Sequence, residues 1–594
     1  MKNDHIDLKR RRALQAIGMG AAALAASPAF SIVLKKEAFR RQGREATAAF
    51  SPDVEIELVA GVARVPILKG AQTQVWRYEG RVLKGDPNSL IALPDNFLGP
   101  VLKFKTGQRV RVYMRNQLPQ NHIIHWHGMH VPFEADGHPS YEVGPGESYV
   151  YEFEVKNRAS TNWFHPHTHL ATASQAYAGL AGLILVEDDE EQALPLPRGE
   201  FDLPLILQDR TFTSDNQLIY DHRGPLSVLG FLGERILVNG KPELAVDVAD
   251  RSYRFRVLNG SNARIFKLAW SDGEPVTVIG TDGGLLERPV TRPYLMISPG
   301  ERYEIWRDFQ GSRGSEVVLL SQEFKGAMPP PYENFIRSGN MQTMMRQMMG
   351  GGMGMMGGRR RGMGMMGGMG GMGPMAILSR HVPQGSRLEL VRFRVSRKAR
   401  DNQPLPQHLR SMPRYRIDET VNPNDPRPIA LGNQGHRFTL NGHLFEMNGA
   451  SPAETFPVNT MQLMEIFHAH GEMEKGEEHQ DGGMSDSGMG GMPGMGNMEL
   501  AMMLAMAHPI HLHGAYFQIV ERIPPHGDGE HGGEGYETVK DGFVDDGYQE
   551  TVLVMPGERI RLIKPFADYK GLFLYHCHNL EHENAGMMRN FKVI

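Results

Sequence analysis

The sequence predicts an all-β protein with three related domains, and two observations carry this prediction. Short stretches such as 149–155, 109–114 and 254–257 alternate apolar with polar residues, and no long helix with one apolar face stands out. Two-residue periods bounded by Gly and Pro are typical of antiparallel strands with one buried face, hence of sandwiches or barrels. The second observation is the tripeptide Pro-Gly-Glu, which precedes an alternating stretch at 145–147, 299–301 and 556–558.

The three copies of this tripeptide are far apart in the chain, so each is expected to mark one domain. The expected limits of these domains are residues 50–190, 195–340 and 376–594. The middle domain holds no cluster of metal-ligating residues and is expected to act as a spacer between the other two. Two low-complexity segments interrupt the β pattern. Residues 341–375 hold fourteen methionines among many glycines, and residues 471–506 combine methionines with glycines and acids. Such composition does not bury a core, so we expect both segments to lie outside the sandwiches.

The first 29 residues have the features of an export signal. A positive run, Lys9 to Arg12, precedes a short apolar stretch, Ala13 to Ala26, and the small residues of 27–29 form a cleavage site. The order at 10–15, Arg-Arg-Arg-Ala-Leu-Gln, resembles a twin-arginine signal, and an ordinary secretory signal is the alternative. We expect export by the twin-arginine machinery to the periplasm, with no stable membrane anchor because the apolar stretch is too short to span a bilayer.

Bulk composition narrows the class of protein. A net charge of −4 argues against a nucleic-acid binder, and 40% hydrophobic residues are enough for sizeable cores. Cys577 is the single cysteine, so the chain has no internal disulfide.

Histidines gather in four short clusters with a spacing that has a structural meaning. On a strand, residues i and i+2 point to the same side, so two histidines separated by one residue share a face. Cys577, between His576 and His578, points to the opposite face. A Cys-ligated metal would then be one residue of backbone away from a His-ligated cluster. The clusters are His125-Trp126-His127-Gly128, His165-Pro166-His167, His508-Pro509-Ile510-His511-Leu512-His513-Gly514 and His576-Cys577-His578-Asn579-Leu580-Glu581-His582.

The residue types around Cys577 favour copper. A thiolate, two imidazoles and a weak axial thioether make a blue-copper site. Cys577 supplies the thiolate, His508 and His582 the imidazoles, and Met587 the thioether. Zinc also takes Cys and His, but a closed zinc site needs four ligands, and twelve candidates in these spacings fit zinc poorly.

The four clusters resemble the four signature motifs of the multicopper oxidases, over nearly the whole mature chain. The resemblance implies cupredoxin-like Greek-key β-sandwich domains, four copper ions, a monomer, one-electron oxidation of a reductant and four-electron reduction of O₂ to water. The resemblance implies no metal-ligand role for His169, which is expected either beside the ligands of the cluster or on the surface. By position, the type 1 copper would take His508, Cys577, His582 and Met587, the type 2 copper His125 and His511, and the two type 3 coppers His127, His165 and His578, and His167, His513 and His576.

Oxygen reduction consumes protons, so buried acids near the cluster are expected to relay them. Asp136 and Glu583 match the family by position and are assigned this role. Glu581 is expected to be a solvated turn acid.

The methionine-rich segments bear on the identity of the reductant. Thioether sulfur selects Cu(I), and these segments resemble those of bacterial cuprous oxidases involved in copper tolerance. A cuprous oxidase is therefore the preferred interpretation, with a laccase-like oxidase of phenols and a non-catalytic copper carrier or structural protein as alternatives. Manganous and ferrous ions stay open as donors. Met502, Met503 and Met506 form either a cuprous docking site before His508 or buried packing.

Overall fold

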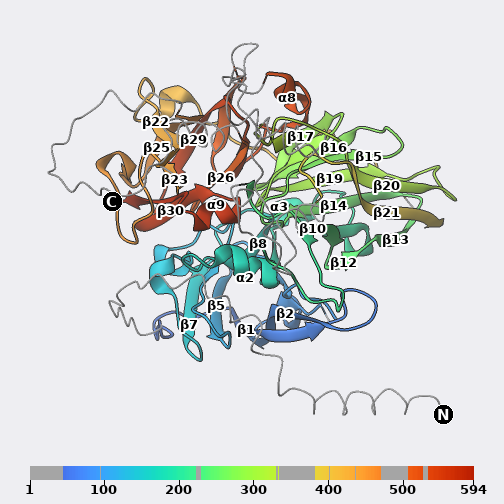
Figure 1. The fold of residues 1–594 in the computed structure, drawn as a ribbon, viewed down its shortest axis with the longest axis horizontal. Coiled ribbons are helices and arrows are strands. Elements are labelled where there is room, and N and C mark those ends of the chain that lie inside the picture. Colours follow the sequence, from blue (N-terminus) through green and yellow to red (C-terminus); the bar gives the residue numbers. More distant parts are fainter. Residues whose placement is uncertain are drawn as a thin grey trace, which may run out of the picture. The chain divides into compact units, whose positions relative to one another are not determined.

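The described residues of the computed structural model form six β-sheets, which pair into three sandwiches (Figure 1). These residues are 44–93, 95–221, 229–329, 332–333, 382–399, 402–434, 437–469, 506–525 and 533–594. The predicted all-β class is confirmed. The predicted export signal (residues 1–29), residues 341–375 and most of 471–506 lie outside the described residues. Within the described part of the chain, no helix is long and apolar enough to cross a membrane.

Domain 1 is drawn in blue to cyan in Figure 1. Its two sheets enclose a core that includes Ile56, Val112 and Phe164. In spatial order, one sheet is β2 (Thr73–Lys84), β1 (Val54–Val65), β5 (Arg109–Asn116) and β7 (Ser148–Glu154), and the other is β3 (Leu90–Ile91), β4 (Val101–Lys105), β9 (Gly182–Glu187), β8 (Ser160–Pro166) and β6 (Ile124–His125). Two short helices, α2 (Thr172–Ala178) and α3 (Asp189–Gln192), follow β8 and β9.

Domain 2 is drawn mainly in green and has its own core, which includes Phe255, Leu268 and Phe393. One sheet is β12 (Lys241–Pro242), β11 (Arg235–Val238), β10 (Asp202–Arg210), β14 (Ser252–Asn259), β19 (Arg302–Asp308), β16 (Val276–Thr281) and β17 (Gly284–Arg292). The other is β13 (Leu244–Ala249), β21 (Leu388–Arg397), β20 (Glu316–Ser321), β15 (Phe266–Trp270) and β18 (Leu295–Ile297).

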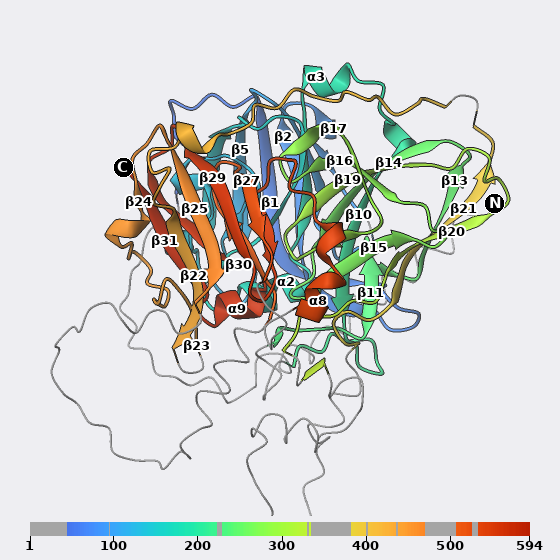
Figure 2. The same ribbon diagram turned by 90° about the horizontal axis from the view of Figure 1, so that it is seen from above.

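Domain 3 is drawn in orange to red, and its core contains Cys577 and Met587. One sheet is β23 (Arg437–Leu440), β22 (Arg427–Gln434), β25 (Thr460–His468), β29 (Arg559–Phe566) and β27 (Gln518–Ile523). The other is β24 (Thr455–Phe456), β31 (Met588–Val593), β30 (Gly571–Cys577), β26 (His508–Leu512) and β28 (Thr551–Val554). Helices α8 (Gly533–Glu537) and α9 (Leu580–Asn584) belong to this part of the chain, and α9 packs against α2 of domain 1 (Figure 2).

The three sandwiches share a pattern of strand pairing. Most pairs are antiparallel, as predicted, but each domain also contains two parallel pairs among its described strands, one in each sheet. The parallel pairs are β1–β5 and β4–β9 in domain 1, β10–β14 and β13–β21 in domain 2, and β22–β25 and β24–β31 in domain 3. The common pattern supports the inference of three related domains.

The three Pro-Gly-Glu turns have the same local structure. The glycines have φ of 81°, 88° and 76°, a left-handed conformation that glycine adopts without a steric penalty. Each glutamate folds back and accepts a hydrogen bond from the backbone N–H three residues earlier, at 2.6, 2.6 and 3.0 Å. The turns lead into β7, β19 and β29. The tripeptide therefore specifies one turn that starts one equivalent strand in each domain.

One domain boundary differs from the expectation. Strand β21 pairs with β13 and β20, so residues 388–397 belong to the sheet of domain 2 and not to a third domain that begins at 376. Figure 1 shows β21, in a later colour, among the green strands. The pairing Ser321↔Leu388 also means that the two strands flanking residues 341–375 are hydrogen-bonded neighbours.

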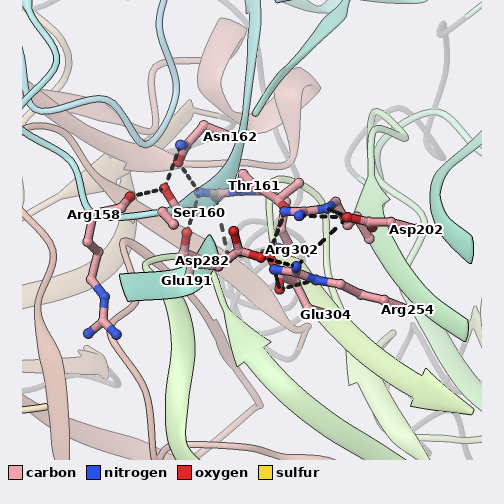
Figure 3. Close-up of polar contacts among 12 residues, drawn as sticks. Arg158, Ser160, Thr161, Asn162, Glu191, Asp202, Arg254, Asp282, Arg302 and Glu304 are labelled. Carbon is pink, nitrogen blue, oxygen red and sulfur yellow. Dashed lines mark hydrogen bonds and ion pairs between the residues drawn. The ribbon is translucent and has the colours of Figure 1, made fainter. Parts of the chain in front are cut away.

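The alternation in β14 does not separate a buried from a solvated face. Phe255 and Val257 are buried as expected, but Arg254 and Arg256 are only 1% and 6% exposed. Arg254 pairs with Glu304 (Figure 3). Arg256 also pairs with Glu304, and it donates to Thr161 Oγ1 of domain 1 at 3.0 Å. The polar face of this sheet is covered by domain 1, so its charges are paired rather than solvated.

Candidate metal centre

The predicted histidine pairs are brought together by strand pairing. In domain 1, β6 and β8 place His125 opposite His165. In domain 3, β26 and β30 place His511 opposite His576. The two sets face each other across the contact between domains 1 and 3, and each of the eight histidines is at most 1% exposed.

Ring nitrogens from different motifs converge on one small volume. His125 Nε2 lies 3.3 Å from His511 Nε2, and His127 Nδ1 lies 3.3 Å from His165 Nε2. His576 Nε2 lies 3.3 Å from His167 Nε2 and 3.2 Å from His513 Nε2. His578 completes the set, with its ring centroid 4.9 Å from that of His127 and 5.2 Å from that of His165.

The outer ring nitrogens of several histidines donate to backbone carbonyls. His125 Nδ1 donates to the carbonyl of Asp136 at 2.6 Å, and His511 Nδ1 donates to the carbonyl of Glu550 at 2.9 Å. His165 Nδ1 donates to the Pro166 carbonyl at 2.8 Å. A proton fixed on Nδ1 leaves the Nε2 lone pair directed at the cluster, which is the arrangement of a metal ligand.

The chemistry of the donor set fits metal ions. Both ring nitrogens of His578 are buried without a hydrogen-bond partner. Burial and neighbouring imidazoles hold the pKa of His167 and His513 well below the ordinary value, so these rings are neutral and their lone pairs face one another. Several neutral donors that crowd one buried volume are stabilised by cations placed between them.

Cys577 lies on the other side of the same strand, as the alternation predicted. Its Sγ is 3.6 Å from His508 Nδ1 and 3.6 Å from His582 Nδ1, and these two nitrogens are 3.3 Å apart. Burial raises the pKa of the Cys577 thiol, so a thiolate at this position needs a bound cation. Met587 is fully buried in the same core, and its carbonyl accepts from the Cys577 N–H at 3.0 Å. A short helix, α9, folds His582 and Met587 back toward the cysteine.

Both predicted acids contact histidines of the cluster. Asp136 Oδ2 accepts from His513 Nδ1 at 2.7 Å, and Glu583 Oε2 lies 3.3 Å from His576 Nδ1. Burial raises the pKa of Asp136, and it raises that of Glu583 to about 8. Both acids therefore hold protons more readily than a solvated carboxyl group does.

Glu581 is not the solvated turn acid that the sequence suggested. It is 2% exposed and accepts hydrogen bonds from Tyr220 Oη at 2.7 Å, the Phe231 N–H at 3.1 Å and Asn262 Nδ2 at 2.8 Å. Because Phe231 and Asn262 lie in domain 2, Glu581 attaches the helix that carries His582 to that domain.

His169 and Met506 are placed as follows. His169 is partly exposed, next to Glu142 and Phe445, and outside the group of facing nitrogens. Met506 is 3% exposed and lines a small cavity with Met328 and Asn579. Met502 and Met503 lie outside the described residues.

Sequence reasoning missed Glu550. This residue is 1% exposed, and its Oε1 lies 3.1 Å from His127 Nε2. No histidine lies near it in the chain, so no spacing pattern pointed to it.

Known proteins are similar to this chain in sequence and in fold. Sequence profiles described as multicopper oxidase match residues 74–191 and 496–594. The multicopper oxidase mco of Staphylococcus aureus is 26% identical over 510 residues, 86% of this chain and 85% of that protein. A laccase of Bacillus subtilis (strain 168) is 26% identical over 568 residues, 88% of this chain and 90% of that protein. Among solved structures, the McoA multicopper oxidase of the hyperthermophile Aquifex aeolicus is 28% identical with a TM-score of 0.66, and the match covers 92% of this chain and 97% of that chain.

Proposed function

We propose that Cu(I) is the electron donor of this protein. The chain belongs to the multicopper oxidase family and is therefore an oxidoreductase that uses O₂. The family resemblance predicted from the four histidine clusters is confirmed. Copper is the metal that the family implies, and the thiolate and imidazole donors described above suit it. We further propose four copper ions, one type 1, one type 2 and two type 3, on the residues assigned by position.

In this proposal, copper ions supply the one-electron chemistry, and the chain supplies the path between the two sites. Cys577 belongs to the electron-accepting site, and the adjacent His576 and His578 belong to the oxygen-reducing site. Electrons therefore cross through the backbone of one strand. Asp136 and Glu583, which contact His513 and His576, hold protons for the oxygen step.

The distribution of methionine is the observation that carries the choice of Cu(I). Fourteen methionines in residues 341–375 and the run that ends at Met506 offer soft thioether ligands in a chain of 36 methionines. Met506 is two residues before His508, and it shares a cavity with Met328 and with Asn579, whose side chain is 3.1 Å from His582 Nε2. Soft ligands thus lie beside the proposed electron-accepting site.

The strand pairing makes the methionine-rich segment testable. Strands β20 and β21 are antiparallel neighbours, so residues 341–375 connect two adjacent strands and their removal leaves both strands paired. We expect the deletion to lower kcat/KM for Cu(I) by about tenfold or more while the blue absorption and copper content are unchanged. A matched control keeps the length and replaces the fourteen methionines with serine.

The two variants separate ligand chemistry from steric effects. If the serine variant loses Cu(I) turnover as the deletion does, thioether recruitment is supported. Unchanged Cu(I) turnover in both variants would eliminate the recruitment proposal.

A laccase-like oxidase of phenols is the second candidate, favoured by the similarity to a protein named laccase. O₂ uptake with a bulky phenol distinguishes the two. Phenol oxidation that rises on deletion of 341–375, with Cu(I) turnover unchanged, would favour this candidate and give the segment the role of a cover.

We also propose that the protein acts as a monomer in the periplasm after twin-arginine export, on the basis of residues 9–29 and of family behaviour. Substitution of Arg10, Arg11 and Arg12 by lysine is expected to leave the protein in the cytoplasm, as measured by cell fractionation. Size-exclusion chromatography with light scattering tests the monomer.

A further inference from the structure

Glu550 contacts two histidines of the oxygen-reducing site in two different ways. Its backbone carbonyl accepts from His511 Nδ1 at 2.9 Å, and its carboxylate Oε1 is 3.1 Å from His127 Nε2. His511 belongs to domain 3, as Glu550 does, whereas His127 belongs to domain 1. One residue therefore contacts histidines on both sides of the domain contact.

Asp136 makes the equivalent two contacts with the roles of domains 1 and 3 exchanged. Its backbone carbonyl accepts from His125 of its own domain at 2.6 Å, and its carboxylate accepts from His513 of the opposite domain at 2.7 Å. The histidines that each acid joins are also stacked ring on ring. The ring centroids are 3.8 Å apart for His125 and His513, and 3.9 Å apart for His127 and His511. The site thus has an approximate twofold arrangement with one acid on each side.

The contact with Glu550 determines which nitrogen of His127 faces the cluster. His127 Nδ1 lies 3.3 Å from His165 Nε2, so Nδ1 is the ligand nitrogen and Nε2 carries the proton. That proton needs an acceptor in a buried site. Glu550 Oε1 at 3.1 Å is the nearest acceptor, with Thr551 Oγ1 at 3.3 Å beside it.

Domain 2 holds Glu550 in place. Arg302, which is fully buried, donates from a guanidinium nitrogen to Glu550 Oε1. The same nitrogen lies 3.3 Å from Asp282 Oδ1 (Figure 3). Asp282 Oδ2 accepts from the N–H groups of Glu550 and Thr551, both at 3.2 Å. Arg302 also donates to the Thr161 carbonyl of domain 1 at 2.9 Å. Domain 2 therefore fixes both the backbone and the carboxylate of Glu550.

We propose that Glu550 is a positioning residue of the oxygen-reducing site, the domain 3 counterpart of Asp136, and that Arg302 and Asp282 of domain 2 hold it in place. It orients His127 and His511 so that Nδ1 of one and Nε2 of the other face the metal. Domain 2 is thereby part of the support of the cluster and more than a spacer. The inference does not depend on the identity of the electron donor.

The test is copper retention rather than turnover. Glu550→Leu removes the acceptor for His127, and loss of an outer hydrogen-bond partner weakens metal binding by about 10- to 100-fold. Copper per chain is measured after dialysis against a graded copper chelator, and the blue absorption of the Cys577 site is recorded in the same samples. We expect loss of copper from the oxygen-reducing site with the blue absorption retained. Glu550→Gln, which still offers an oxygen acceptor, is expected to restore copper retention to within a few-fold of the wild type.

Glu304→Leu is the matched control. Glu304 lies two residues from Arg302 on β19, is fully buried and pairs with Arg254 and Arg256, as Glu550 pairs with Arg302. It is expected to lower the melting temperature without releasing copper. The proposal is overturned if Glu550→Leu retains copper like the wild type, or if Glu304→Leu releases as much copper as Glu550→Leu.

If Glu550→Leu lacks the blue absorption because it does not fold, Glu550→Asp decides the question. This shorter acid keeps the charge but withdraws the carboxylate from His127, so copper loss supports the proposal and full retention refutes it.

Discussion

Replacement of Asp136 by asparagine tests how the chain delivers protons to O₂. The substitution nearly preserves size and shape, and the backbone carbonyl that accepts from His125 at 2.6 Å is unaffected. The amide oxygen can still accept from His513 Nδ1, now 2.7 Å from the carboxylate. The ionisable proton is the one property that is lost. We therefore expect the blue absorption and the copper content to be intact.

The expected sizes of the two effects differ. A hydrogen bond to a charged acceptor contributes about 1.5–3 kcal/mol and a neutral one about 1 kcal/mol, so the cost to the orientation of His513 is about 1 kcal/mol. Loss of a positioned proton donor slows a reaction by about 10²–10⁴-fold. Slowing of the oxygen step by 10²-fold or more, with a copper affinity reduced less than tenfold, would therefore identify proton delivery as the role of Asp136.

The assay is single-turnover reoxidation of the fully reduced enzyme by O₂ in a stopped-flow instrument. Glu454→Gln is the control, because Glu454 is a buried acid of domain 3 that pairs with Arg589 and Tyr575 and contacts none of the cluster histidines. Reoxidation of Asp136→Asn at the wild-type rate would refute the relay. Equal slowing in both variants would attribute the effect to general destabilisation.

Two further predictions follow from buried groups of the chain. Cys577→Ser is expected to abolish the blue absorption and nearly all turnover while the other copper ions remain, as measured by optical spectroscopy and metal analysis; a persistent blue band would contradict the assignment of the thiolate. Burial raises the pKa of Glu301 to about 8 from an ordinary value of 4.5. The protonated carboxyl group therefore adds to the free energy of unfolding. This contribution is complete below pH 4.5 and is lost as the pH rises through 8. Urea unfolding of the copper-free protein at pH 5 and pH 9 is therefore expected to show a smaller loss of stability for Glu301→Gln than for the wild type, and equal losses would refute this reading.

Strand geometry explains why much of the site could be predicted from the sequence. Histidines two residues apart share a face of a strand wherever the strand lies, so the convergence of the pairs and the opposite orientation of Cys577 could be predicted. The strands themselves end within the motifs, and the second histidine of each pair lies one or two residues beyond its strand. The Pro-Gly-Glu turns could also be predicted from the sequence, because the glutamate of each turn accepts a hydrogen bond from within the same turn.

The contributions of domain 2 could not be predicted, because they depend on which surfaces meet. The pattern around Arg254 is that of a solvated face, but this face contacts Glu191 and Thr161 of domain 1 and is buried. Glu550 and Glu581 reach their partners through contacts between domains, and a linear spacing carries no information about such contacts. The boundary at residue 376 was displaced for a similar reason, since β21 returns to its sheet after a long insertion.

The pairing of β20 with β21 has a consequence for how readily the methionine-rich segment between them can change. A connection between two neighbouring strands can change in length and composition at little cost, because the ends stay fixed by the sheet and loop closure depends weakly on length. A methionine-rich segment at this position is thus an exchangeable module. Under the role proposed for this segment, its exchange would change the donor preference and leave the strands that carry the proposed copper ligands intact.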